Sequence, residues 1–163
     1  MKYFKISLGI FVALALTRFI PHPPNFTSLI ALSFYVPALL GLRFLPALII
    51  SFVLTDIFLG FHNTLLFTWG SVFVIAFISK YFSNGVISRV CGSLFGAILF
   101  YIITNFGVWS LGSYGYTING LLSCYTLALP FFAYSVISTL IFSALIETVL
   151  KLKLINFKSI KLN

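Results

Sequence analysis

The chain has 163 residues, of which 61% are hydrophobic and 7% are charged, and its mean hydropathy is +1.14. A soluble domain carries roughly 45–50% apolar and about 25% charged residues, so the composition excludes an ordinary soluble globular protein and makes the lipid bilayer the expected solvent. The net charge of +8 gathers at the ends of apolar segments, which indicates membrane topology and attraction to anionic lipid rather than nucleic-acid binding.

Six apolar segments approach the length of about 20 residues that a helix needs to cross a bilayer. In chain order they cover residues 4–20, 28–42, 44–60, 65–80, 88–105 and 126–150. Turn-forming residues separate them, among them a Pro-rich loop at 21–25 and a long Gly/Ser/Tyr/Asn stretch from Asn105 to Ser123. The second segment is short and contains Pro37. The sequence therefore predicts an all-α integral membrane protein, a six-helix transmembrane bundle that forms a single domain over residues 1–163.

Basic residues divide unevenly between the two ends of these segments. Nine of the ten fall at one end: Lys2, Lys5, Arg43, Lys80, Arg89, Lys151, Lys153, Lys158 and Lys161. Arg18 alone falls at the other end. Because cytoplasmic loops collect Lys and Arg, both termini are predicted to be cytoplasmic, and the C-terminal lysines, spaced among Leu and Ile, suit a helix end on the inner surface.

The first segment allows a second interpretation. Lys2 and Lys5, the apolar run after them and Ala13-Leu14-Ala15 also match a cleavable signal peptide. Against this interpretation, the apolar run continues to Ile20. Within the segment, Gly9 and Ala13 form a pair of small residues four apart, which favours close helix packing in lipid.

Polar and aromatic residues gather at the outward ends of the segments, in clusters at residues 17–26, 55–63, 104–109 and 114–125. Their convergence at one depth predicts an outward-facing cavity. Asp56, one of two acidic residues, lies about one turn inside a helix end, where an ionisable group faces a bundle interior or a wet cavity. It is expected to pair with Arg18, either to fix two helices or to rim a substrate pocket. Glu147, the other acid, is expected to form an ordinary i,i+4 pair with Lys151.

Further candidates lie at the same depth. His22 and His62 are either hydrogen-bonded interface residues or, with Asp56 and Cys124 nearby, metal ligands. Asn25, Thr27 or Ser28 is expected to cap the second helix, and Asn105 to satisfy backbone groups or touch a ligand. Four aromatic residues either line the pocket or form an interfacial belt, to which Trp69 also belongs: Trp109, Tyr114, Tyr116 and Tyr125. Cys91 and Cys124 are predicted to lie a membrane apart, with no disulfide between them.

The whole chain resembles the substrate-binding (S) components of energy-coupling-factor vitamin transporters. The likeness is clearest over residues 28–60, where Pro37-Ala38-Leu39-Leu40-Gly41 leads into a helix that ends Leu54-Thr55-Asp56-Ile57-Phe58-Leu59-Gly60. The chain is also similar to an uncharacterised bacterial membrane family marked by Pro-His-Pro-Pro-Asn-Phe, Asp-x-x-Leu-Gly-Phe-His and Thr-Asn-Phe-Gly-x-Trp, and to the solitary cobalamin-specific S component.

This resemblance implies a protein of the bacterial inner membrane that captures a vitamin or similar micronutrient, with cobalamin as the specific candidate. It implies an energy-coupling transmembrane subunit and ATPases as partners. S components dock that subunit through two small residues on the first helix, for which Gly9 and Ala13 are the nearest match. Some cobalamin-specific relatives carry a cobalt-ligating Cys, a role for which Cys124 is the candidate here.

The leading prediction is therefore a substrate-capture protein that is not an enzyme, needs no cofactor and carries no nucleotide-binding motif of its own. Its predicted substrate-binding residues are Arg18, His22, Asn25, Asp56, His62, Asn105, Trp109, Tyr116, Cys124 and Tyr125, with the stretch from Asn105 to Ser123 as a gate. The alternatives are an integral membrane enzyme with Asp56 and a histidine as acid and base, a haem- or metal-binding subunit with His22 and His62 as ligands, and a structural or assembly protein.

Overall fold

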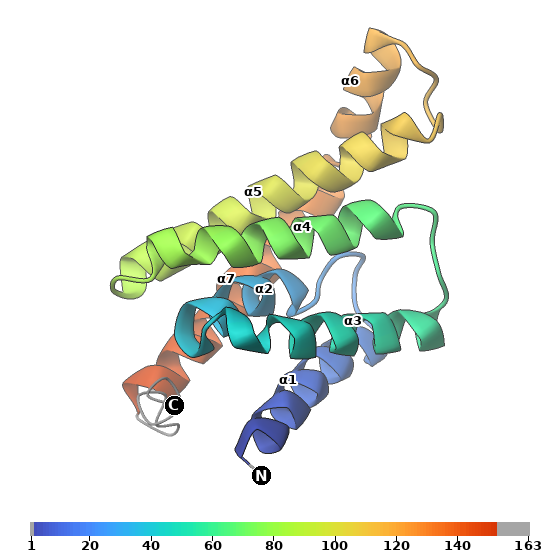
Figure 1. Ribbon diagram of the computed structural model, residues 1–163. Coiled ribbons are helices and arrows are strands. Elements are labelled where there is room, and N and C mark those ends of the chain that lie inside the picture. Colours follow the sequence, from blue (N-terminus) through green and yellow to red (C-terminus); the bar gives the residue numbers. More distant parts are fainter. Residues whose placement is uncertain (1, 153–163) are drawn as a thin grey trace.

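The computed structural model describes residues 2–152, and every regular element among them is helical (Figure 1). The elements in chain order are α1 (Lys2–Phe19), α2 (Leu29–Leu40), the 3-10 helix η1 (Leu42–Phe44), α3 (Leu45–Leu59), α4 (Leu65–Ile78), the 3-10 helix η2 (Ser79–Phe82), α5 (Val86–Ser110), α6 (Ile118–Leu127) and α7 (Leu129–Lys151). The all-α prediction is confirmed. Lys153, Lys158 and Lys161, with the surface helix end expected around them, lie outside the described residues.

Four helical stretches in residues 2–152 are long and apolar enough to cross a membrane: Leu42–Leu59, Leu65–Phe82, Val86–Ser110 and Leu129–Lys151. Many side chains on the outer surface of these helices are large, apolar and exposed, including Leu66, Ile87 and Leu145. By length and composition these are the helices of a multi-pass membrane protein. α2 is equally apolar but has only 12 residues, as expected for the short second segment.

The bundle is built around α2, which contacts α4, α5 and α7. Phe34 and Tyr35 of α2 are almost completely buried and form part of one continuous apolar core. α2 contains Pro37 and ends at Leu40. Gly41 follows with a φ of 91°, in the left-handed region that glycine adopts without strain, and so allows the chain to leave the helix there. α1 runs without a break through Ala13-Leu14-Ala15, where Leu14 is fully buried.

The helix ends fall into two groups (Figure 1). We call one the terminal end: it holds the start of α1, the end of α7 and the turns α2–α3 and α4–α5. The other, which we call the loop end, holds the α1–α2 loop, the α3–α4 loop and α6. The predicted basic ends of the segments, as far as the structure describes them, lie at the terminal end, and the predicted polar clusters lie at the loop end.

The prediction of a loop from Asn105 to Ser123 is wrong for most of these residues, which are helical. α5 continues to Ser110 and α6 begins at Ile118, so residues 111–117 alone connect the two helices. Asn105 lies within α5, and its side-chain amide donates to the carbonyl of Tyr101, one turn earlier, at 2.7 Å. Thr117 starts α6 by accepting the backbone N–H of Gly120 on its hydroxyl oxygen at 3.0 Å. The stretch expected to form a gate is therefore largely helical.

Candidate functional site

Two adjoining chambers lie at the loop end. Chamber A has a volume of about 360 Å³ and is lined by residues of the α1–α2, α3–α4 and α5–α6 loops and of α4, α5, α6 and α7. Chamber B has a volume of about 190 Å³ and is lined mainly by α1, the α1–α2 loop, α2 and α3. Asn25, His62, Thr68 and Phe100 line both chambers, so the two share a wall. The cavity expected from the four polar clusters is therefore present and divided in two.

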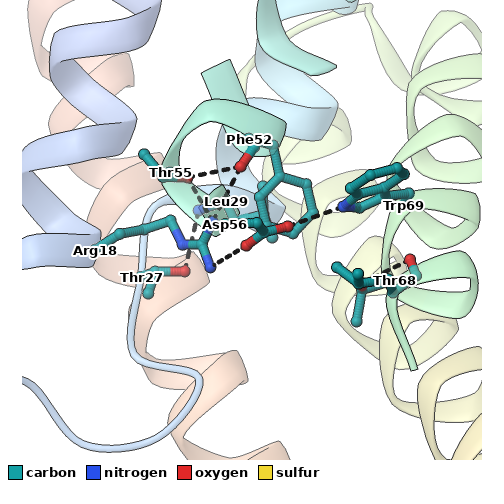
Figure 2. A network of polar contacts seen from close by, with 9 residues as sticks. Arg18, Thr27, Leu29, Phe52, Thr55, Asp56, Thr68 and Trp69 are labelled. Carbon is teal, nitrogen blue, oxygen red and sulfur yellow. Dashed lines mark hydrogen bonds and ion pairs between the residues drawn. The ribbon is translucent and has the colours of Figure 1, made fainter. Parts of the chain in front are cut away.

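An ion pair joins α1 and α3, two of the helices that line chamber B. Nη2 of Arg18, at the end of α1, lies 2.6 Å from Oδ1 of Asp56 in α3. The other carboxylate oxygen of Asp56 accepts the indole N–H of Trp69 in α4 at 2.9 Å, so one carboxylate joins three helices (Figure 2). Asp56 is only 1% exposed. The Arg18–Asp56 pair is confirmed, and Trp69, expected in an aromatic belt, is a second partner of Asp56.

The guanidinium of Arg18 makes further contacts on α3. Its Nη1 donates to the carbonyl of Phe52 at 3.3 Å and to the hydroxyl of Thr55, and its plane lies over the Phe52 ring, 4.6 Å from the centroid. Phe52 and Thr55 are one helical turn apart, so they present both oxygens to the same guanidinium. Three of the five N–H bonds of Arg18 are thus engaged. The side chain remains 15% exposed and lines chamber B.

Three more predicted residues come from the two interhelical loops. His22 and Asn25 follow α1, and His62 follows α3; His22 lines chamber B, while the other two line both chambers. Nδ1 of His22 lies 2.6 Å from the carbonyl of Ile20. Asn25 adopts a φ of 62°, a turn conformation that asparagine tolerates better than most residues. In the part of the chain that the structure describes, the side chains of Asn25 and His62 have no hydrogen-bond partner.

Asn105 and Cys124 bring α5 and α6 to chamber A. The thiol of Cys124 donates to the backbone carbonyl of Asn105 at 3.4 Å, and Cys124 is only 2% exposed. Cys91 and Cys124 are both free, as expected. The Asn105 amide nitrogen is engaged within its own helix, which leaves its side-chain oxygen able to accept a hydrogen bond from a ligand. Tyr114 also lines this chamber.

Reasoning from the sequence missed several lining residues outside the predicted polar clusters: Thr64, Thr68, Phe100, Tyr101, Phe131, Phe132 and Ser135. A signal for some of them was present. Tyr101 lies four positions before Asn105, so helical periodicity places the two side chains on the same face of α5. Thr104 lies directly before Asn105, within the predicted cluster 104–109. Phe131 and Phe132 carried no such signal, because aromatic residues in an apolar helix face lipid as readily as a cavity.

Four predicted residues lie outside the lining of both chambers: Asp56, described above, and three aromatic residues. Trp109 donates to the carbonyl of Thr117 at 3.3 Å and packs against the ring of Tyr116, which is 73% exposed. Tyr125 donates to the carbonyl of Ile102 at 2.7 Å, and its ring meets Tyr101 edge-on. These contacts brace α6 against α5. A direct contact of Trp109, Tyr116 and Tyr125 with substrate stays a prediction.

Two of the alternatives depend on particular groups of side chains. Within residues 2–152, no group of three or more His, Cys, Asp or Glu side chains lies close enough to hold a metal ion. The carboxylate of Asp56 contacts Arg18 and Trp69, and no hydrogen bond or ion pair of the described residues joins it to His22 or His62. The acid–base pair that the enzyme alternative needs is therefore not formed in this arrangement.

A second buried ion pair lies at the terminal end. Nε and Nη2 of Arg89 donate to the two carboxylate oxygens of Glu147, each at 2.7 Å, and the hydroxyl of Tyr35 donates to Oε1 at 3.0 Å. The expected pairing of Glu147 with Lys151 is wrong, because the planar guanidinium of Arg89 satisfies both oxygens at once, which a lysine on the same helix cannot do. Lys151 is exposed. This pair joins α5, α7 and α2.

Gly9 and Ala13 line a third cavity, about 390 Å³ in volume, between α1, α2 and α7. Its walls are apolar side chains such as Ile6, Leu39 and Ile146, and Lys5 lines it as well. A Cβ atom added to Gly9 would have no neighbour within 4 Å. The two small residues thus leave a groove rather than allowing a close approach of another helix of this chain.

Comparison with known proteins gives one family. A model described as a family of unknown function (DUF6580) matches residues 1–159. No curated protein matches the chain, and no solved structure matches it.

Proposed function

We propose that this chain, which belongs to the DUF6580 family of unknown function, is a substrate-capture membrane protein for uptake of a vitamin or similar micronutrient. The observation that carries the proposal is the convergence of predicted binding residues from separate segments on two chambers that share a wall. Those that line a chamber are Arg18, His22, Asn25, His62, Asn105 and Cys124. A wall of aromatic and apolar residues with a few convergent polar groups is the usual composition of a small-molecule site.

The proposed topology has six membrane passes, α1, α2, α3, α4, α5 and α7, with both termini cytoplasmic and the chambers facing outward from a bacterial inner membrane. Lys5, Arg43, Lys80 and Arg89 support it, because all four lie at the terminal end and positive residues favour the cytoplasmic side. α2 is too short for a full pass by itself. Its contacts with α4, α5 and α7 keep it within protein.

The chamber volumes bear on the size of the substrate. Pockets for drug-sized ligands have volumes of roughly 300–1,000 Å³, and chambers A and B together fall in this range. A vitamin with one or two rings fits that space. Cobalamin, the candidate named by the S-component resemblance, is considerably larger, so its capture requires the α1–α2 and α3–α4 loops to move apart.

The energy for uptake is proposed to come from partner subunits, an energy-coupling transmembrane subunit and ATPases. The groove beside Gly9 and Ala13 supports a docking site, because small residues let a partner helix approach the backbone closely in lipid. The groove is apolar over most of its length. An apolar transmembrane helix is therefore the complementary partner surface.

Mass spectrometry of small molecules that co-purify with the full chain tests the capture of a substrate. The wild-type protein is expected to retain one compound, and Asn105→Ala to retain less of it, because Asn105 supplies an acceptor in chamber A. Asn84→Ala, in the exposed α4–α5 turn at the terminal end, is the matched control and is expected to retain as much as wild type. Absence of any compound from the folded wild-type protein would refute capture.

Cysteine labelling tests the topology. In a background with Ser at positions 91 and 124, His62→Cys is expected to react with a membrane-impermeant maleimide in intact cells. Asn84→Cys, at the opposite end of the bundle, is expected to react only after the membrane is permeabilised. The reverse pattern would place the chambers on the cytoplasmic side and contradict uptake from outside.

A further inference from the structure

We infer that the captured molecule is an organic anion whose oxyanion group binds Arg18 in chamber B and whose uncharged, ring-bearing body occupies chamber A. This inference rests on the proposed function and adds the chemical class of the substrate. It follows from three features of the chambers: the sign of their charged residues, the unengaged donors of Arg18, and the different walls of the two chambers.

The charged and imidazole side chains of the lining favour a negative ligand. Arg18, His22 and His62 line chamber B, and of these only His62 also reaches chamber A. No aspartate or glutamate among residues 2–152 lines either chamber. A cationic ligand would therefore enter a site with no carboxylate to receive it, and would meet the guanidinium of Arg18 instead.

Asp56 orients Arg18 without blocking it. Both carboxylate oxygens of Asp56 are already bonded, one to Arg18 and one to Trp69, and the residue is buried outside the lining of the chambers. Arg18 keeps two N–H bonds, on Nε and Nη2, that no described residue accepts, and its side chain borders chamber B. A guanidinium fixed by a carboxylate and by two oxygens of α3 is preorganised to donate its remaining N–H groups to a ligand oxyanion. Asp56 is in this sense a positioning residue.

Chamber A fits an uncharged body. Phe100, Tyr101, Phe131 and Phe132 supply aromatic walls, and Asn105 supplies one free acceptor oxygen. Rings pack against such walls in edge-on or offset geometry. Because the two chambers share a wall that includes Phe100 and His62, one ligand spans both. The site thus separates the anionic group of the ligand from its ring.

The test uses paired charge removal at the two ends of the bundle. In the full-length double variant Arg18→Gln/Asp56→Asn, both charges of the pair at chamber B are lost together, so neither is left unpaired. The double variant Arg89→Gln/Glu147→Gln removes the equivalent pair at the terminal end and serves as the matched control. Compounds retained by wild type and by each variant are identified and quantified by mass spectrometry, with circular dichroism to confirm that each variant is folded.

The expected result is a co-purified anion whose affinity falls about 10- to 100-fold in the chamber B variant, the effect of losing hydrogen bonds to a charged group, and is unchanged in the control. Fragmentation distinguishes a carboxylate, by loss of carbon dioxide, from a phosphate ester. If the chamber B variant does not fold, Arg18→Lys is used instead. Lysine keeps the positive charge but lacks the planar guanidinium that donates two parallel hydrogen bonds, so this variant is expected to bind the anion about 10-fold more weakly.

The outcomes separate this inference from the proposed function. A retained compound that is uncharged or cationic overturns the inference and leaves substrate capture standing. The same holds for an anion that Arg18→Gln/Asp56→Asn or Arg18→Lys binds as tightly as wild type does. A wild-type protein that retains no compound refutes both.

Discussion

Substitution of Asp56 by Asn isolates the charge of the carboxylate at the centre of the α1–α3–α4 contact. The asparagine keeps the shape of the side chain and an oxygen that can accept from Trp69, but Arg18 loses its counter-ion. Breaking a buried ion pair by neutralising one partner costs about 3–5 kcal/mol. Arg18 is 15% exposed and keeps its contacts with Phe52 and Thr55, so the lower end, about 3 kcal/mol, is expected.

For a chain of this size, 1 kcal/mol corresponds to a change in Tm of roughly 2–4 °C, so Asp56→Asn is expected to lower the Tm by about 6–12 °C. The assay is thermal unfolding in detergent micelles, followed by circular dichroism. Arg18→Gln and the double variant complete a cycle, in which the double variant is expected to be more stable than the sum of the single changes implies, by about 2 kcal/mol.

Two results would contradict this reasoning. A loss of less than about 2 °C in Asp56→Asn, which corresponds to under about 1 kcal/mol, would mean that the pair contributes little to stability. Strict additivity of the two single changes would mean that Arg18 and Asp56 do not depend on each other. Asn84→Ala, which touches neither ion pair, controls for the effect of an arbitrary polar substitution.

Three further changes in stability are expected from the same unfolding assay. Glu147→Gln removes the carboxylate of the second buried ion pair and is expected to cost about 3 kcal/mol; a loss equal to that of an exposed substitution would contradict its structural role. Gly92→Ala places a carbon 2.5 Å from Cβ of Phe82 and is expected to cost about 1–3 kcal/mol, whereas Gly70→Ala meets no atom within 4 Å and is expected to be neutral or stabilising. Thr139→Val replaces a fully buried hydroxyl that has no partner among the described residues, so the variant is expected to be as stable as wild type or more stable by about 1 kcal/mol; a clear loss would reveal a partner for the hydroxyl.

The candidate site was partly predictable from the sequence, for a reason specific to membrane proteins. With so few charged residues, Arg18 and Asp56 at matching depths had no other partner at that end of the bundle, so their pairing followed by elimination. Glu147 was the opposite case. Arg89 and Lys151 both lay at its depth, and only the packing of α5 against α7 decided between them.

Aromatic residues were the least predictable part of the site. Trp69 binds the carboxylate of Asp56, although it was expected in an interfacial belt. Trp109 and Tyr116, expected either to line the pocket or to join that belt, contact the α5–α6 connection instead. Trp and Tyr suit a wet interface, a lipid boundary and a buried hydrogen bond equally well. Residue type alone therefore does not indicate which of these surroundings an aromatic side chain has.

The sequence by itself determined where the long apolar helices lie, though not α6 or the end of α5, and at which end the polar side chains gather. Length, hydropathy and turn residues are local properties, which is why the sequence reveals them. The rotation of each helix about its axis was decided only by the tertiary structure. A helix that is apolar on every side carries no stripe to mark its inward face, so the division of the cavity into two chambers, and the choice of Trp69 and Arg89 as partners, depend on how the small and large side chains of neighbouring helices pack.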